Sequence, residues 1–349
     1  MRTLLITAIA GAALLTAQTP LDKRAHQWWN DRAVGGRPYT ANARKMALIS
    51  VKGNRFVDPQ GRTILFRGLS IADPDKLEGQ GHWNKELFIK AKEMGAAIVR
   101  IPVHPVAWRE RTPAEYLKLL DQAVEWATGL DLYIDLDWHS IGNLTTGLFQ
   151  DPMYDTSQQE TYNFWRTAAR HFAGHNTVAF FELFNEPTTF RNQLGPVNWT
   201  EWKRIQEDLI AMIRANNAQA IPLVAGFDWA YDLTPVLLAP INAEGIAYVT
   251  HPYSNKRPRP WEPKWEEDFG FAAGKYPVFA TEFGGFAAPG ANAPDAYGPA
   301  IIKYLESRGI SWMVWCFDPE WGPTLLSNWE FKLTPSGEFA KQAMMGPRQ

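Results

Sequence analysis

Short runs of β-forming apolar residues alternate along this chain with longer stretches in which apolar residues recur at helical spacing. Eight short runs can be distinguished, at residues 64–70, 96–103, 131–137, 178–184, 221–226, 246–250, 277–281 and 310–316. The clearest helical stretches between them span residues 83–94, 113–128, 157–171 and 198–214. Such alternation is typical of parallel β/α architecture. Because eight units close a barrel, we predict a (β/α)8 barrel, the TIM-barrel fold.

An open, doubly wound sheet is the alternative that this pattern leaves. That fold usually carries a glycine-rich phosphate-binding turn after its first strand. Residues 69–73, Leu-Ser-Ile-Ala-Asp, contain no glycine, so the barrel is favoured. The 349 residues, 46% of them hydrophobic, suit one large domain better than two average ones.

The whole chain divides into three segments. Residues 1–17 combine a charged start, a short apolar run and a final alanine, which is typical of a cleaved secretory signal peptide. Residues 18–47 are polar and irregular, and we expect them to form an arm. Residues 48–349 form the barrel domain, which begins with a predicted hairpin around the turn at residues 58–61; we expect this hairpin to plug the barrel floor.

Charge and composition narrow the expected partners. Acidic and basic residues nearly cancel, 37 against 35, so we expect no nucleic-acid partner. No apolar run reaches the roughly 20 residues of a membrane-spanning helix, and we expect no membrane anchor. The single cysteine, Cys316, excludes an intramolecular disulfide. We expect a monomer that is secreted or periplasmic in a bacterium.

Two glutamates stand directly after apolar runs, where the strands of a barrel present their functional residues. Glu186 follows the fourth run and Glu282 the seventh. Retaining glycosidases need two carboxyl groups about 5 Å apart, one to protonate the leaving group and one to attack the anomeric carbon. Because two such residues occur together, we predict that they form a catalytic pair that hydrolyses a glycosidic bond.

The residues around these acids resemble glycoside hydrolase family 5, whose barrel carries its acids on strands four and seven. The resemblance covers most of the chain after about residue 48. The matching motifs are Val99-Arg100-Ile101-Pro102, Asp137-Trp138-His139, Asn185-Glu186-Pro187, His251-Pro252-Tyr253, Thr281-Glu282-Phe283-Gly284 and Trp315.

The resemblance implies a role for each matching residue. Glu186 is expected to be the acid/base and Glu282 the nucleophile. Arg100 and Tyr253 are expected to keep Glu282 ionised. Further expected substrate-binding residues are Asn185, which donates to the sugar 2-hydroxyl, His139 and His251, which line the cleavage subsite, and Trp315, which stacks on the sugar. The family implies no cofactor and no metal.

The chain has 16 tryptophans, more than packing requires, so we expect some of them to face a ligand. Outside the matching motifs, Trp229 and Trp321 are the preferred sugar platforms. Glu182 is expected to pair with an interior arginine. Cys316 is expected to turn toward the helix layer and to be unreactive.

The predicted activity is endo-acting, retaining hydrolysis of a β-1,4-linked polysaccharide, with cellulose or another β-glucan as first choice. A β-mannanase, a xyloglucanase and an exo-acting β-glucosidase stay open as alternatives, because loop geometry decides among them. A non-catalytic carbohydrate-binding protein is disfavoured because both acids are present. A metal-dependent hydrolase is disfavoured because neither His-x-His nor His-Glu-x-x-His occurs.

Overall fold

The computed structural model of the chain describes residues 38–216, 218–286 and 296–347. The predicted signal peptide and most of the predicted arm therefore lie outside the described residues. Within the arm, the amide of Tyr39 donates to the carbonyl of His171 (2.7 Å), and the Tyr39 ring stacks on His171 and His175. The described end of the arm thus packs beside a helix of the barrel.

Eight parallel strands close into a barrel, as predicted. They are β4 (Arg67–Ser70), β5 (Ile98–Val103), β6 (Tyr133–Trp138), β9 (Val178–Glu182), β11 (Ile221–Ala225), β12 (Ala247–Thr250), β13 (Val278–Ala280) and β14 (Ser311–Val314). Around the barrel the order is β11-β12-β13-β14-β4-β5-β6-β9, so each strand lies beside its neighbours in sequence. Seven of the eight strands lie within a predicted apolar run, and β6 extends one residue beyond its run, which covers residues 131–137.

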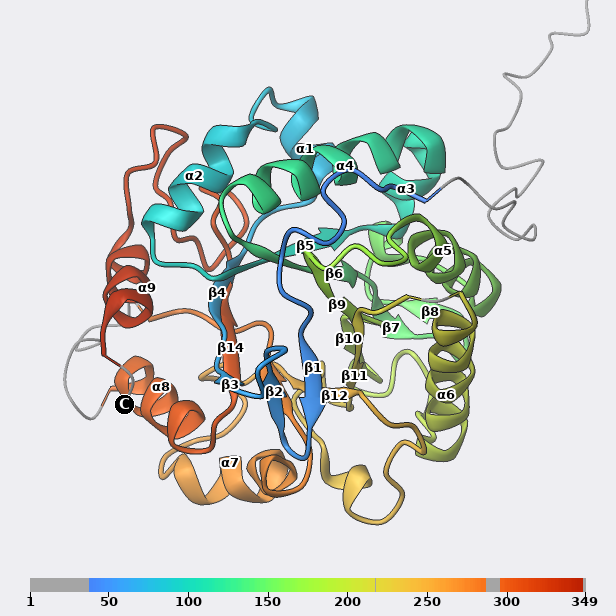
Figure 1. Ribbon diagram of the computed structural model, residues 1–349. Helices are drawn as coiled ribbons and strands as arrows, with labels where there is room; N and C mark the ends of the chain where they lie inside the picture. The colour runs from blue at the N-terminus through green and yellow to red at the C-terminus, as the bar shows by residue number, and fades with distance from the viewer. Residues whose placement is uncertain (1–37, 217, 287–295, 348–349) are drawn as a thin grey trace, which may run out of the picture.

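Helices form an outer layer around the strands (Figure 1). The four predicted helices correspond to α2 (Lys85–Glu93), α4 (Pro113–Gly129), α5 (Gln158–His171) and α6 (Trp199–Ala215). The described chain also forms α1 (Pro74–Gly79), α3 (Pro105–Arg111), α7 (Glu262–Asp268), α8 (Tyr297–Ser307) and α9 (Pro335–Met345), with 3-10 turns at η2 (Pro152–Tyr154), η3 (Thr234–Leu237) and η4 (Gly270–Gly274). None of the helices in the described ranges is both long and apolar enough to cross a membrane.

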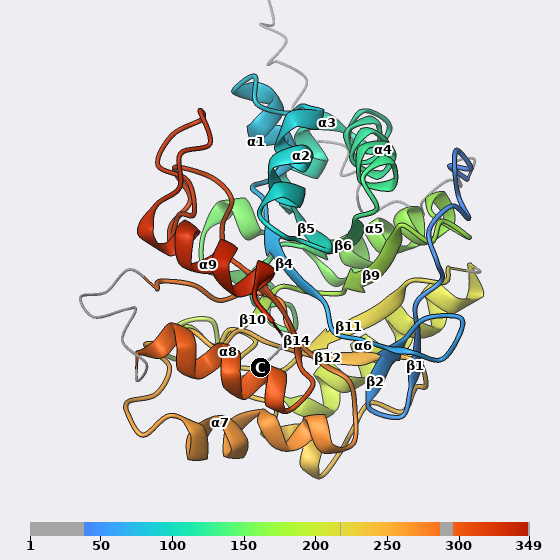
Figure 2. The ribbon, with the colours of Figure 1, turned by 60° about the vertical axis from the view of Figure 1, so that its left-hand side comes forward.

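The predicted hairpin plugs one end of the barrel, close to β14 and β12 in both views (Figures 1 and 2). It consists of β1 (Ser50–Lys52), β2 (Arg55–Val57) and β3 (Thr63–Ile64). Phe56 on β2 is 2% exposed, and its ring lies 5.0 Å from that of Phe180 and 5.9 Å from that of Phe279. Apolar side chains therefore fill the end of the barrel that the hairpin covers. The opposite end, where the strands terminate, is left for a polar site.

Replacement of Phe56 by alanine tests this role of the hairpin. A large cavity in a packed core costs about 3–5 kcal/mol, so we expect the free energy of unfolding to fall by that amount in urea titrations. Leu238→Ala is the control, because that side chain is 95% exposed and its loss should change stability by less than about 0.5 kcal/mol. A small effect of Phe56→Ala would show that the hairpin is not part of the barrel core.

Candidate active site

Glu186 is carried by a short strand outside the barrel. The barrel strand β9 ends at Glu182, and the chain then enters β10 (Glu186–Pro187), which pairs in parallel with β7 (Ile141–Asn143). The amide of Glu186 donates to the carbonyl of Ser140 (3.1 Å). With β8 (Leu148–Phe149), these strands form a small three-stranded sheet that fixes Glu186.

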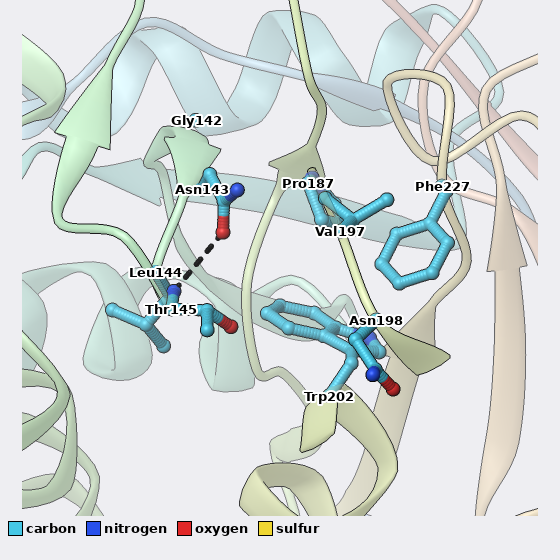
Figure 3. A pocket seen from close by; sticks show the side chains of 9 residues that line it. All are labelled: Gly142, Asn143, Leu144, Thr145, Pro187, Val197, Asn198, Trp202 and Phe227. Carbon is cyan, nitrogen blue, oxygen red and sulfur yellow. Dashed lines mark hydrogen bonds between the residues drawn. The ribbon is translucent and has the colours of Figure 1, made fainter. Parts of the chain in front are cut away.

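Packed side chains support this small sheet from behind. Figure 3 shows a crevice lined by Asn143, Pro187, Trp202 and Phe227, among others, that has no room for a water-sized molecule. The Asn143 amide donates to the carbonyls of residues 194 and 196 (3.1 and 3.0 Å), and the Trp202 indole donates to that of residue 225 (2.9 Å). The residues of the crevice therefore pack behind Glu186 and support its position.

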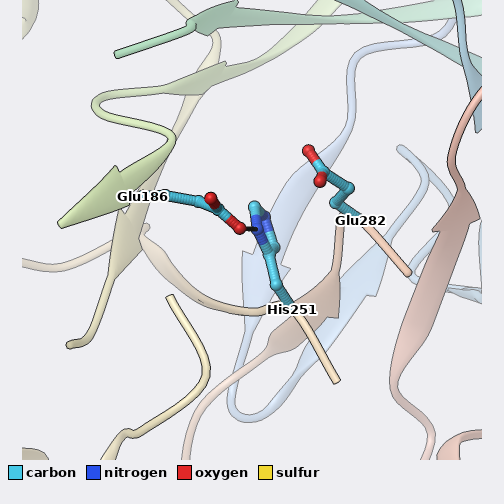
Figure 4. A group of neighbouring side chains, drawn as sticks. All are labelled: Glu186, His251 and Glu282. Carbon is cyan, nitrogen blue, oxygen red and sulfur yellow. Dashed lines mark hydrogen bonds and ion pairs between the residues drawn. The ribbon is translucent and has the colours of Figure 1, made fainter. Parts of the chain in front are cut away.

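Glu282 and Glu186 approach each other at the C-terminal end of the barrel. Glu282 follows β13, and Figure 4 shows the two carboxyl groups on either side of His251. A side-chain oxygen of each glutamate and a ring nitrogen of His251 all lie within 4.8 Å of one another. Both glutamates are largely buried. The predicted convergence of strand-four and strand-seven acids is thus present in the geometry.

A fully buried guanidinium, that of Arg100 on β5, organises the carboxylates. Its Nη1 lies 3.0 Å from Oε2 of Glu282, and its Nε and Nη2 bind both oxygens of Glu182 (2.8 and 2.9 Å). Glu182 therefore has the structural role expected of it. Nη2 also donates to Oδ1 of Asn185 (2.6 Å). The Asn185 amide nitrogen is buried without a partner among the described residues, which leaves a donor for a ligand.

Burial and the charge of Arg100 shift the pKa values of the neighbouring acids in opposite directions. Burial opposes ionisation of Glu182, but the Arg100 charge and hydrogen bonds from His251 outweigh it and lower the pKa of Glu182 to about 2. Asp137 lies 3.1 Å from Arg100, yet burial, together with the charges of Glu182 and Glu282, raises the pKa of Asp137 well above its usual value. The positive charge of Arg100 therefore acts on all three carboxyl groups, but at Asp137 burial and the neighbouring acids outweigh it.

Both oxygens of Glu282 are held by donors. Oε2 faces Arg100, and Oε1 accepts from the Tyr253 hydroxyl (2.9 Å). Burial raises the pKa of Glu282 above its usual value, while the charges of His251 and Arg100 and the Tyr253 hydrogen bond oppose that rise. Burial and the neighbouring acids raise the pKa of Tyr253 well above its usual value, so its hydroxyl keeps the proton that it donates.

His251 is the second cation of the site. Its Nδ1 lies 3.0 Å from Oε1 of Glu186, and its Nε2 lies 3.0 Å from Oγ1 of Thr281 and 3.4 Å from Oε1 of Glu182. Burial favours the neutral ring, but the charge of Glu282 and the hydrogen bonds to Glu182 and Glu186 outweigh it and raise the pKa of His251 to about 9. The imidazole is therefore charged at neutral pH.

His139, which is neutral, and Trp315 lie side by side next to the two acids. Burial lowers the pKa of His139 well below its usual value, as do the charges of His104 and Arg100, and the ring lies parallel to Trp315 with centroids 5.3 Å apart. Trp315 is 7% exposed, and its indole donates to the carbonyl of residue 322 (3.2 Å). Cys316 is fully buried in the hydrophobic core cluster that also contains Trp315.

Trp229 and Trp321 lie on two different sides of the acids. The amide of Trp229 donates to the carbonyl of Pro187 (3.2 Å), directly after Glu186, and its indole donates to Gln150 (2.9 Å). Trp321 lies nearly parallel to Trp315, with centroids 6.1 Å apart. Both are half-buried, whereas Trp108 and Trp138 are packed in the core. All ten predicted site residues are therefore linked at one end of the barrel.

Trp229 lies in an unusual backbone conformation. Asp228, Trp229 and Ala230 are successive left-handed residues, with φ of 56°, 56° and 58°, and each costs roughly 1–2 kcal/mol. Lys256 donates to the carbonyl of Asp228 (2.5 Å), and its ammonium lies 4.6 Å from the centre of the Trp229 ring. Strain of this kind is concentrated at functional sites.

Several residues at the site were not among the predicted site residues. His104 directly follows β5 and lies 4.7 Å from His139, and Tyr154 of η2 stacks on His104 at 5.6 Å. Asp73, which follows β4, lies 2.9 Å from the His104 ring. The positions of Asp73 and His104 just after strand ends were a usable signal. Tyr154 lies in a long loop whose path no local pattern reveals.

One group of residues has donor atoms close enough to hold a metal ion, among the residues that the structure describes. It consists of Glu186, His251 and Glu282. Two carboxylates and an imidazole suit zinc or a similar ion. In the described structure, however, both nitrogens of His251 lie within hydrogen-bonding distance of protein oxygens, so a metal would have to displace one of these contacts.

Comparisons with known proteins identify the family of this chain and several relatives. The family model described as "Cellulase (glycosyl hydrolase family 5)" matches residues 57–320. Endoglucanase E-5 of Thermobifida fusca is 26% identical over 298 residues, which cover 82% of this chain but 59% of that protein, so the chain spans little more than half of that relative's length. An endoglucanase of Clostridium saccharobutylicum is 23% identical over 90% of this chain and 69% of its own length.

Solved structures include a relative of higher identity. The β-glucanase SdGluc5_26A from Saccharophagus degradans, solved in complex with cellotetraose, superposes with a TM-score of 0.85 at 45% identity, and the match covers 91% of this chain and 98% of that one. The catalytic domain of the major endoglucanase of Xanthomonas campestris gives 0.69 at 21% identity over 86% of this chain and all of that one, a likeness of fold. With a family model matched over most of its length, this chain belongs to glycosyl hydrolase family 5.

Proposed function

We propose that this protein is an endo-acting β-1,4-glucanase that retains the configuration of the anomeric carbon. The observation that carries the proposal is the approach of Glu186 and Glu282 to within 4.8 Å. Retaining glycosidases hold their carboxyls about 5–5.5 Å apart, whereas inverting enzymes leave about 6.5–9.5 Å for a water. A glucan is favoured as substrate because the structural relative at 45% identity is a β-glucanase solved with cellotetraose.

The hydrogen bonds assign the two acids to different steps. Glu282, whose oxygens face Arg100 and Tyr253, is the nucleophile that attacks the anomeric carbon. Glu186 gives its proton to the departing glycosidic oxygen as that bond breaks. The product of this step is a glycosyl ester of Glu282. Glu186 then removes a proton from water, which attacks the same carbon and releases Glu282.

The remaining site residues bind the sugar in this scheme. The unpartnered amide of Asn185 donates to the 2-hydroxyl, His139 and His251 border the cleavage subsite, and the Trp315 ring packs against the sugar face. The Trp229 amide is hydrogen-bonded to the carbonyl of Pro187, directly after Glu186, and its ring packs against the leaving sugar.

We further propose that the protein acts as a monomer and that it is located outside the bacterial cytoplasm. The location accords with the charged and apolar pattern of residues 1–17.

Removal of either carboxylate tests the pair directly. We expect Glu186→Gln and Glu282→Gln each to lose at least a thousandfold in kcat on β-1,4-glucan, because an amide neither protonates the leaving oxygen nor attacks. Reducing-sugar release measures the loss, and circular dichroism checks the fold. Wild-type turnover in either folded variant would contradict the assignment.

Azide rescue separates the roles of the two acids. In Glu186→Ala, a substrate with a good leaving group still forms the glycosyl-enzyme, and azide should then attack it to give a β-glycosyl azide. In Glu282→Ala, azide should replace the nucleophile and give the α-azide. NMR of the products distinguishes the two anomers. The reverse pattern would exchange the roles, and an inverted sugar from wild type would refute the retaining mechanism.

The charge of His251 provides a pH-dependent test. Because Glu282 is the neighbour whose charge most raises the pKa of His251 to about 9, neutralising Glu282 removes support for the cation, and the pKa must fall. We expect a fall of about one to two units both in Glu282→Gln and in wild type trapped as a 2-fluoroglycosyl ester. Imidazole NMR titration measures it. An unchanged or higher pKa would show that Glu282 does not carry the charge assigned to it.

A further inference from the structure

Asp135 is a buried acid that the proposed mechanism does not use. It lies on β6 with no exposed surface, and no donor among the described residues forms a hydrogen bond to either of its carboxyl oxygens. Such a group is costly, because a buried polar atom loses its hydration without gaining a partner. A neighbour that accepts a hydrogen bond from a protonated Asp135 would remove this cost.

Asp135 lies between the charged residues of the site and the apolar end of the barrel. In the strand register it is the partner of Arg100 on β5 and of Phe180 on β9, whose ring belongs to the apolar cluster at the hairpin end. Its ionisable neighbours are Glu182, Arg100 and Asp137. The Arg100 guanidinium bonds to other side chains, so Asp135 receives no hydrogen bond from the nearby cation.

The strand register shifts next to Asp135. Ile134 is the partner of Val178, but Asp135 is the partner of Phe180, so β9 has an extra residue at this point. Bulges of this kind change the direction of side chains and are frequent beside active sites. Here the side chains of Asp135 and Glu182 come within hydrogen-bonding reach of each other.

Glu182 is therefore the acceptor that Asp135 can reach. Two carboxylates are both acceptors, so they form a hydrogen bond only if one of them holds a proton. Glu182 is the ionised member, because Arg100 donates to both of its oxygens (2.8 and 2.9 Å) and the Thr281 hydroxyl donates to Oε1 (3.1 Å). Asp135 has no such donors, and burial and the charge of Glu182 raise its pKa well above the usual value.

The balance of buried charges agrees with a neutral Asp135. The two cations, Arg100 and His251, are matched by the carboxylates of Glu182 and Glu282. An ionised Asp135 would add a charge without a counter-ion beside the apolar cluster, which is far more costly than a buried carboxylic acid.

We propose that Asp135 is a positioning residue that keeps its proton and donates it in a hydrogen bond to Glu182. This bond fixes the Glu182 carboxylate where it binds Arg100, and Arg100 in turn contacts Glu282 (3.0 Å). Because the bond draws electron density from Glu182, more of the Arg100 charge acts on Glu282, the proposed nucleophile. The inference rests on the proposed function and deepens it: the alignment of the nucleophile depends on a proton buried below it.

Asp135→Asn tests the retained proton through stability. The amide has the shape of the neutral acid and still donates, but it binds no proton. Wild type must take up a proton on Asp135 when it folds above the ordinary aspartate pKa of about 3.9. Its stability therefore falls as the pH rises from that value toward the raised pKa of the folded state, whereas the variant lacks this dependence.

Urea titrations at several pH values measure this difference. We expect the unfolding free energy of Asp135→Asn, relative to that of wild type, to rise between about pH 4.5 and 7.5 with the slope of about one bound proton per molecule. A difference that does not depend on pH would overturn the proposal.

Infrared spectra detect the proton directly. The difference between wild type and Asp135→Asn at neutral pH should contain the C=O stretch of a protonated carboxylic acid. Glu207→Gln on α6 is the matched control, because pairing with Lys203 lowers the pKa of Glu207 against the effect of burial. That variant should lose carboxylate bands and no acid band. Loss of carboxylate bands in Asp135→Asn would contradict the proposal.

Kinetics test the effect of Asp135 on the nucleophile. Asp135→Leu removes the donor, and we expect kcat on β-1,4-glucan to fall about tenfold, with KM little changed because Asp135 does not contact the sugar. Asp135→Asn keeps a donor and should stay within about threefold of wild type, and Glu207→Gln should be unaffected. Wild-type kcat in a folded Asp135→Leu variant would overturn the positioning role.

The stability and infrared measurements do not depend on turnover. If wild type hydrolyses no β-glucan, the proposed function is at fault, and these two measurements still decide whether Asp135 holds a proton. They also decide this if Asp135→Leu does not fold, because both use Asp135→Asn. An ionised Asp135 in an active wild-type enzyme would overturn this inference alone.

Discussion

The buried guanidinium of Arg100 is the interaction on which the site depends. It lies with no exposed surface among three carboxylates, and it contacts Glu182, Asp137 and Glu282 within 3.1 Å. Removing such ions from water costs several kcal/mol each, and good geometry offsets that cost only in part. The cluster is therefore better explained by the chemistry that it prepares than by the stability that it adds.

Two features of the fold make this cluster possible. Aromatic side chains around Phe56 fill the end of the barrel that the hairpin covers, so the Arg100 cluster lies above them, toward the C-terminal ends of the strands. Glu182 is the last residue of its barrel strand, and it neutralises the guanidinium from below while Glu282 lies at the open end. The site thus combines a fully buried base, where electrostatic interactions are strong, with two acids that lie nearer the surface.

Much of this arrangement could be predicted from the sequence, because the period of a β/α barrel specifies where each strand ends. Glu186 and Glu282 follow from that rule, whereas Arg100, which lies within β5, follows from the resemblance to the family. What could not be predicted depends on chain paths with no local period. The outer strand β10 pairs with residues 141–143, more than 40 positions away, and the carboxylate that orients His104 comes from a different strand. Residues 1–37, with the predicted signal peptide, lie outside the described structure.

The two acids are attached to different parts of the molecule. Glu282 follows a barrel strand and inherits the rigidity of the closed barrel, whereas Glu186 belongs to the small sheet β10-β7-β8. Changes in the loop between β7 and β8 can therefore shift Glu186, the proposed proton donor, while Glu282, the proposed nucleophile, stays in place. In the proposed mechanism, a change in that loop would therefore alter which leaving groups are tolerated without moving the residue that forms the covalent intermediate.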